Sequence, residues 1–176
     1  TIDNICFKYS GNFAIRAAIE SDNITVSNCE IGWIGGALQP DGKNVYGNGI
    51  EFLRGTQNTV VKNCWIYQIF DSAITIQGTT NASECYTDVT FENNLLEYCG
   101  MSGIEWWCES MLEAGSEDAT VIRNVAFTGN IIRFTGYGWV KNAIRCARHI
   151  QGPWRAYTFT NMSNFTITGN TFDCAL

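Results

Sequence analysis

The sequence is poor in proline and histidine and has no long hydrophobic run. Only 2 of its 176 residues are Pro and only 1 is His, which excludes a zinc site built from several histidines. No apolar stretch approaches the roughly 20 residues that a membrane-spanning helix needs. These absences argue against membrane insertion and against a metal centre, so no metal ligands are expected.

Basic charge is scarce as well. The chain has 11 Lys and Arg against 17 Asp and Glu, a formal net charge of -6, and its basic residues are scattered along the sequence. A nucleic-acid partner is therefore not expected. The 8 cysteines include no Cys-x-x-Cys pair, so redox chemistry is disfavoured and most of the thiols are predicted to fill the core.

Two short patterns repeat along the chain. The longer one has nine residues and occurs as NITVSNCEI at 23–31, NTVVKNCWI at 58–66, DVTFENNLL at 88–96, NVAFTGNII at 124–132 and NFTITGNTF at 164–172. The shorter one reads small–apolar–variable–apolar and occurs as AIRA at 14–17, GIEF at 49–52, AITI at 73–76, GIEW at 103–106 and AIRC at 143–146. The two patterns alternate, which is typical of a repeating supersecondary unit.

The longer pattern predicts two short strands joined by a sharp corner, because apolar residues alternate on both sides of its sixth position. That position is always Asn or Gly, the residues that adopt left-handed backbone angles at low cost: Asn28, Asn63, Asn93, Gly129 and Gly169. Asn4 is assigned to the same column from its spacing to the short pattern that follows it. The next column is predicted to point inward and to stack from coil to coil, with the Asn side chains hydrogen-bonding to one another: Cys29, Cys64, Asn94, Asn130 and Asn170.

With the shorter pattern as a third strand, each repeat supplies three strands, which predicts an all-β solenoid of about five coils. The repeated apolar–x–apolar–x–Asn/Gly–Asn corner resembles the right-handed parallel β-helix family, the pectate-lyase-like superfamily of polysaccharide-processing enzymes and phage or surface proteins. Residues 1–176 are expected to form one β-helix domain, an excerpt of a longer β-helix with both ends uncapped, whose end coils pair with further coils of the same chain.

A closer resemblance is carried by the segments GNGIEF, IYQIFDSAITIQG and GYGW, which are similar to uncharacterised bacterial β-helix repeat proteins linked to carbohydrates. This resemblance implies a polysaccharide or oligosaccharide as the partner and a secreted, periplasmic or cell-surface location in a bacterium. The Asn-Thr-Asp and Gly-His-Gly signatures of polygalacturonases and the Asp-Pro-His of the epimerases are missing from this sequence.

Insertions between the repeats point to the sheet of third strands as the site. The links that follow these strands grow from five residues at 53–57 to eleven at 77–87 and seventeen at both 107–123 and 147–163, and a further insertion spans 35–48. Loops on a solenoid carry function more often than its repeats do. A substrate groove is therefore predicted along the third sheet.

The variable residues of the third strands are predicted to face outward in one column: Arg16, Glu51, Thr75, Glu105 and Arg145. Glu51 and Glu105 lie two coils apart, which places their backbones about 10 Å from one another. Their carboxylates can then approach the roughly 6.5–9.5 Å that separates acid and base in inverting glycosidases. Glu105 is the predicted acid and Glu51 the base, with Asp71 assisting. The alternative is that the column is an ordinary solvated face.

Further residues are predicted to bind the sugar. They are cationic or aromatic side chains in and after the last third strand, together with Trp107 at the start of a loop: Arg145, Arg148, His149, Trp154 and Trp107. Arginine offers forked hydrogen bonds, and an exposed tryptophan offers a stacking surface.

The sequence thus favours a polysaccharide glycoside hydrolase that requires no cofactor. A polysaccharide lyase is an alternative, and it would call for a Lys or Arg base and a calcium site. The other alternative is a non-catalytic module of the adhesin or phage-tail type, which binds glycan or serves as structure.

Overall fold

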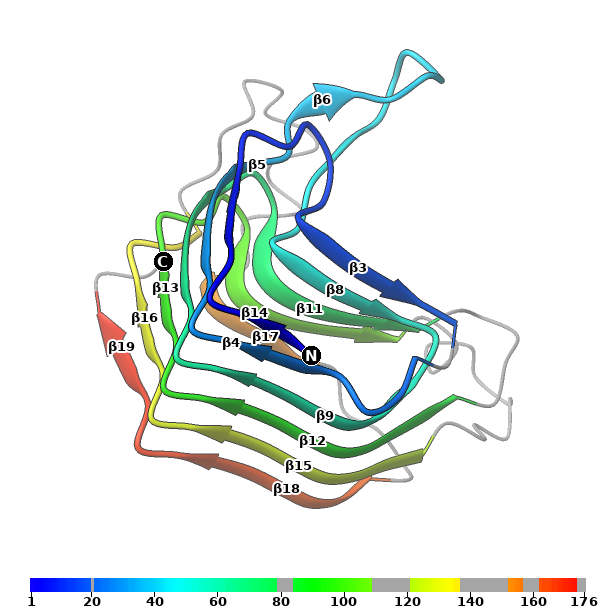
Figure 1. The fold of residues 1–176 in the computed structure, drawn as a ribbon, viewed down its shortest axis with the longest axis vertical. Helices are drawn as coiled ribbons and strands as arrows, with labels where there is room; N and C mark the ends of the chain where they lie inside the picture. The colour runs from blue at the N-terminus through cyan, green and yellow to red at the C-terminus, as the bar shows by residue number, and fades with distance from the viewer. Residues whose placement is uncertain (20, 79–83, 109–120, 137–151, 157–161, 174–176) are drawn as a thin grey trace.

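The computed structural model describes residues 1–176 except 20, 79–83, 109–120, 137–151, 157–161 and 174–176. Nearly all of its strands belong to three parallel sheets, which form the walls of a coil (Figure 1). The described part of the chain contains no helix that is long and apolar enough to cross a membrane.

Each coil contributes one strand to each sheet in turn. Sheet A contains β1 (Ile2–Asp3), β4 (Thr25–Ser27), β9 (Thr56–Lys62), β12 (Cys85–Glu92), β15 (Val121–Thr128) and β18 (Met162–Thr168). Sheet B contains β2 (Cys6–Lys8), β5 (Glu30–Ile34), β10 (Trp65–Ile69), β13 (Leu95–Glu97), β16 (Ile131–Arg133) and β19 (Thr171–Asp173). Sheet C contains β3 (Ile15–Ala18), β8 (Ile50–Leu53), β11 (Ser72–Gly78), β14 (Ser102–Cys108) and β17 (Gly152–Ala156).

The predicted parallel β-helix is confirmed, with about six coils in place of the five expected. The sixth coil is seen in β18 and β19. The insertion at 35–48 forms a small antiparallel hairpin of β6 (Ala37–Leu38) and β7 (Val45–Tyr46), which projects at the top of Figure 1. It connects sheet B to sheet C in the second coil.

The corner between sheets A and B has the predicted geometry. The φ angle is +54° at Asn28, Asn63 and Asn93, +56° at Asn4, and +66° and +65° at Gly129 and Gly169. All six residues therefore adopt the left-handed conformation that the choice of Asn and Gly indicated.

The column after this corner forms the predicted ladder of buried side chains. Asn130 receives hydrogen bonds at its Oδ1 from the backbone and side-chain amides of Asn94, both at 3.0 Å, and its own Nδ2 donates to the Phe91 carbonyl at 2.9 Å. Asn170 accepts from Asn130 in the same way at 2.9 Å. In the earlier coils Cys29 and Cys64 occupy this column, and both are buried. The cysteines at these positions are core fillers, as predicted.

The core is a stack of apolar side chains from all three sheets. It includes the large buried residues Phe52, Phe91, Phe127, Tyr86 and Trp106 and a series of isoleucines. Trp106 was predicted to point inward and is fully buried, with its ring packed edge-on against Tyr86 and Phe127. Burial of this apolar surface is the main stabilising term of such a stack.

The fifth coil differs from the prediction. The predicted third strand at 143–146 lies outside the described residues, and the strand that pairs with β14 is β17. The long connection of this coil therefore precedes the strand of sheet C, between β16 and β17, and does not follow it as predicted. Long connections consequently occur on both edges of sheet C.

Candidate active site on sheet C

The predicted column of variable residues exists on sheet C. Register pairs Arg16 with Glu51, Glu51 with Thr75 and Thr75 with Glu105. Glu105 is in turn paired with Arg155, which holds the position that was predicted for Arg145. Glu51 and Glu105 are thus two coils apart, with backbones about 10 Å from one another, as expected.

Three members of the column, Glu51, Thr75 and Glu105, are buried although the column lies on the outer side of the sheet as predicted. Glu51 alternates along β8 with the core residues Ile50 and Phe52, so it lies on the outer side of the sheet, yet its relative exposure is only 2%. Glu105 is 1% exposed and Thr75 is 0% exposed. An ordinary solvated charge ladder is therefore excluded for these three residues. Charged groups are rarely buried in this way unless specific partners hold them.

Glu51 has two partners, Arg16 from the neighbouring coil and Asn48 from the segment directly before β8. The guanidinium of Arg16 donates from Nε to Oε1 at 2.7 Å, and the side-chain amide of Asn48 donates to Oε2 at 2.8 Å. The Arg16 side chain is 44% exposed, so its outer part is in contact with solvent. Charge-assisted hydrogen bonds of this kind offset the cost of burying a carboxylate.

Glu105 lies among hydroxyl groups. Its Oε2 accepts from Ser72 Oγ at 3.3 Å and from Thr75 Oγ1 at 3.2 Å. Ser72 Oγ also lies 2.8 Å from Ser102 Oγ, so a third hydroxyl is hydrogen-bonded to one of the two that contact the carboxyl group. All of these side chains are buried.

Asn48 joins the two carboxylates into one network. Besides donating to Glu51, it accepts a 3.1 Å hydrogen bond from the backbone amide of Ser72, which contacts Glu105. Its neighbours Gly47 and Gly49 are both crowded, since a Cβ at Gly47 would lie 2.0 Å from Gly35 Cα and one at Gly49 would lie 2.4 Å from the Ala73 carbonyl oxygen. The sequence analysis missed Asn48, although the Gly-Asn-Gly segment before Glu51 was a visible signal of a tightly packed turn.

The remaining predicted site residues divide into three groups. Asp71 is half-buried directly before β11, as predicted, with its backbone bonded to Gly47 and Met101. The backbone of Trp107 lies within β14, in register with Gln77, and does not begin a loop. The backbone of Trp154 lies within β17, in register with Ile104 of β14. Arg145, Arg148 and His149 lie outside the described residues.

Within the described ranges, no group of three or more His, Cys, Asp or Glu side chains is arranged to hold a metal ion. The chemistry that these residues of sheet C can perform is therefore that of carboxyl groups supported by an arginine, an amide and hydroxyls.

Comparison with known proteins adds information on the fold. No protein-family model matches the chain, and no curated protein matches it. Among solved structures, the periplasmic alginate epimerase AlgG is similar, with a TM-score of 0.51 and 12% sequence identity. The match covers 98% of this chain and 38% of the epimerase chain, so the protein described here spans well under half of that structure. At this level of identity the likeness shows a shared parallel β-helix fold.

Proposed function

We propose that the outer face of sheet C is the active site of a polysaccharide-processing enzyme, a glycoside hydrolase in which Glu105 is the acid and Glu51 the base. The observation that carries this proposal is the pair of buried carboxyl groups in one register column, two coils apart and joined through Asn48 and Ser72. The fold shared with an alginate epimerase supports a polysaccharide as the substrate class.

The proposed reaction is hydrolysis with inversion. Glu105 donates its proton to the glycosidic oxygen as the bond from that oxygen to the anomeric carbon breaks. Glu51 takes a proton from a water molecule whose oxygen attacks the anomeric carbon from the opposite face. Arg16 orients Glu51 through their ion pair, and the hydroxyls of Ser72 and Thr75 orient Glu105. Asp71, directly before β11, assists at the edge of the sheet.

The burial of both carboxyl groups favours a second candidate function. In that case the network from Arg16 to Glu105 only fastens adjacent coils to one another, and the protein is a non-catalytic glycan-binding or structural module. A glycan-binding module keeps the polysaccharide as the partner and differs from the hydrolase in that no glycosidic bond is broken, whereas a structural module needs no polysaccharide.

The first test is to incubate the protein with a panel of neutral and acidic polysaccharides and to weigh the released oligosaccharides by mass spectrometry. Products that have gained one water are expected. Products with an unsaturated end would indicate a lyase, and acidic polymer of unchanged mass but altered uronate stereochemistry would indicate epimerisation. Either result would contradict the paired-glutamate mechanism.

Substitution of the acid then separates catalysis from binding. Glu105→Gln keeps the shape of the side chain and removes its acidic proton. We therefore expect turnover to fall about a hundredfold or more while glycan binding persists. Glu92→Gln is the matched control, because Glu92 is a half-buried glutamate on sheet A, in register with Lys62 and Thr128. Equal turnover in both variants would show that Glu105 is not the acid. Glycan binding without any turnover in the unmodified protein would establish the second candidate.

A further inference from the structure

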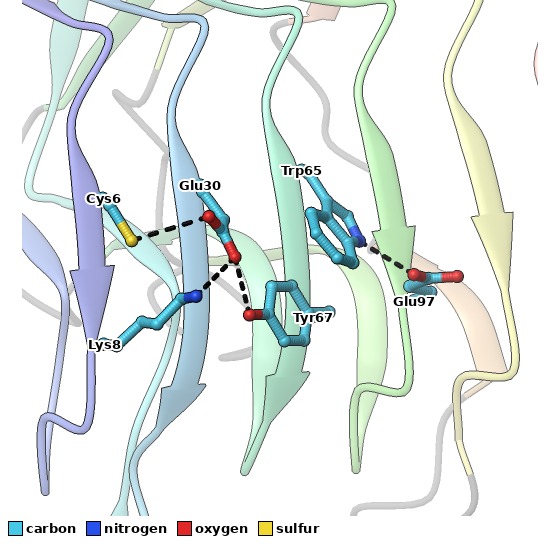
Figure 2. Close-up of polar contacts among 6 residues, drawn as sticks. All are labelled: Cys6, Lys8, Glu30, Trp65, Tyr67 and Glu97. Atoms are coloured by element: carbon cyan, nitrogen blue, oxygen red, sulfur yellow. Dashed lines mark hydrogen bonds and ion pairs between the residues drawn. The ribbon is translucent and has the colours of Figure 1, made fainter.

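The outer face of sheet B carries a second group of ordered side chains, on a different sheet from the sheet C site. We call the following residues the sheet B face: Lys8, Glu30, Trp65, Tyr67, Glu97 and Arg133. They come from five consecutive coils, and the close-up in Figure 2 shows most of them side by side across the strands.

The two aromatic rings of this face, the exposed Trp65 and the half-buried Tyr67, are held in place by neighbouring groups. Trp65 is 42% exposed, its Nε1 donates to Glu97 Oε1 at 2.8 Å, and its ring stacks on Tyr67 with centroids 4.3 Å apart (Figure 2). The Tyr67 hydroxyl donates to Glu30 Oε1 at 2.8 Å. The Tyr67 ring lies across Gly32, where a Cβ would approach its Cζ to 2.5 Å. Rings held in this way lose little conformational entropy when a ligand stacks on them.

The charges of the sheet B face are paired with one another. Lys8 Nζ lies 2.7 Å from Glu30 Oε1, and Arg133 Nε lies 2.7 Å from Glu97 Oε2. The hydrogen bonds from Lys8 and Tyr67 hold the pKa of Glu30 below its usual range, so this carboxylate stays ionised and remains an acceptor. Two cations and two anions leave the face without net charge, which does not suit a nucleic acid or an anionic membrane.

A column of bulky residues at the end of the sheet B strands extends the aromatic surface. Its members are Tyr9, Trp33, Gln68, Tyr98 and Phe134, with φ angles of +63°, +58°, +53°, +55° and +52°. Left-handed angles disfavour such residues, and the corner between sheets A and B uses Asn and Gly instead. Tyr9, Trp33 and Tyr98 are 78%, 51% and 41% exposed, and Tyr98 stacks on Phe134. These bulky residues adopt a strained left-handed backbone conformation, and several of them have exposed rings. Backbone strain at such positions indicates a role beyond folding.

We propose that the sheet B face, with its aromatic corner column, is a second polysaccharide-binding surface that holds an uncharged glycan chain along the helix axis. Aromatic rings stack on the C–H faces of pyranoses, and the neighbouring carboxylates accept hydrogen bonds from sugar hydroxyls. The coil spacing of roughly 4.8 Å is close to the length of one sugar unit in an extended chain, so successive coils meet successive sugars. The paired charges among the rings are unlike the core of a protein interface, from which charged residues are depleted.

This surface is separate from the proposed active site and does not depend on its chemistry.

The test is native affinity electrophoresis and calorimetry with soluble neutral polysaccharides, namely xyloglucan, galactomannan and starch. All measurements use the Glu105→Gln background, so that turnover does not consume the probe. We expect binding to at least one probe, and we expect Trp65→Ala and Tyr98→Ala to weaken it about tenfold each.

Two variants serve as controls. Trp65→Phe keeps a ring but loses the hydrogen bond to Glu97, so its affinity is expected to stay nearer to that of the unsubstituted protein. Ile19→Ala removes a side chain of similar exposure that lies outside the sheet B face, and it is expected to bind normally. Circular dichroism checks that each variant is folded. Unchanged affinity in folded Trp65→Ala and Tyr98→Ala, or no binding to any neutral probe, would overturn the proposal.

Discussion

At the scale of single residues, burial decides which side chains are available for chemistry. Glu51 and Glu105 keep polar partners inside the structure, whereas the buried thiols of Cys64 and Cys99 are surrounded mainly by apolar core. Desolvation raises the pKa of Cys64 to about 11 and raises that of Cys99 further still. Since the thiolate is the reactive form, these two thiols are predicted to be inert near neutral pH.

Thiol labelling tests this difference directly. With a maleimide at pH 8, Cys6 and Cys85, which are exposed and free, are expected to react in the native protein. Cys29, Cys64 and Cys99 are buried and are expected to react only after denaturation. Peptide mass spectrometry reports each site. Rapid native labelling of Cys64 would show that the core is open at this position.

The same raised pKa predicts a fall in stability at alkaline pH. The Cys64 thiol ionises near its ordinary value of 9.0 in the unfolded chain and only near 11 in the folded one. The unfolded state therefore loses protons first, and the free energy of unfolding decreases as pH rises from about 9 to 11. Cys64→Ala, which removes the titrating group, is expected to flatten this decrease in urea titrations at pH 8, 9.5 and 10.5. An unchanged pH slope in the variant would contradict the assignment to Cys64.

At the scale of elements, the corners set the shape of each coil and the side-chain ladder joins one coil to the next. Asn130 illustrates both roles, because it follows the left-handed Gly129 and bonds to Asn94, Asn170 and the Phe91 carbonyl. The repeated strand–corner–strand unit was predictable from the sequence since left-handed angles select Asn and Gly within a few residues of chain. The ladder was predictable because identical positions of a solenoid stack.

Removal of one ladder amide tests its contribution to stability. Asn130→Ala leaves the backbone amide of Asn94 and the Phe91 carbonyl without their partners inside the core. We expect the free energy of unfolding to fall by roughly 2–3 kcal/mol. Thr128→Ala is the control, because Thr128 is half-buried at the end of β15, two residues before Asn130, and its effect should stay within about 0.5 kcal/mol. Urea denaturation measures both, and equal losses would show that the ladder has no special role.

At the scale of the whole molecule, the three sheets present three different outer faces. Sheet C holds the buried carboxyl network, and sheet B holds exposed rings with paired charges. Sheet A carries side-chain hydrogen bonds between neighbouring coils, such as those from Asn164 to Asn124 and from Asn124 to Asp88.

The sequence by itself determined the strands, the corners and the stacking of the coils, because these depend on local backbone preference and on a regular alternation of apolar residues. It also identified Glu51 and Glu105 as members of one column. Only the tertiary structure decided that Glu51 and Glu105 are buried. It also decided that the backbone of Arg155 is in register with Glu105, at the position that was predicted for Arg145. Alternation tells which face of a strand a side chain takes, but burial depends on what packs over that face. An arginine lies between apolar residues in two segments of the sequence, 143–146 and 153–156. The hydrogen bonding between coils determines which of these segments pairs with β14.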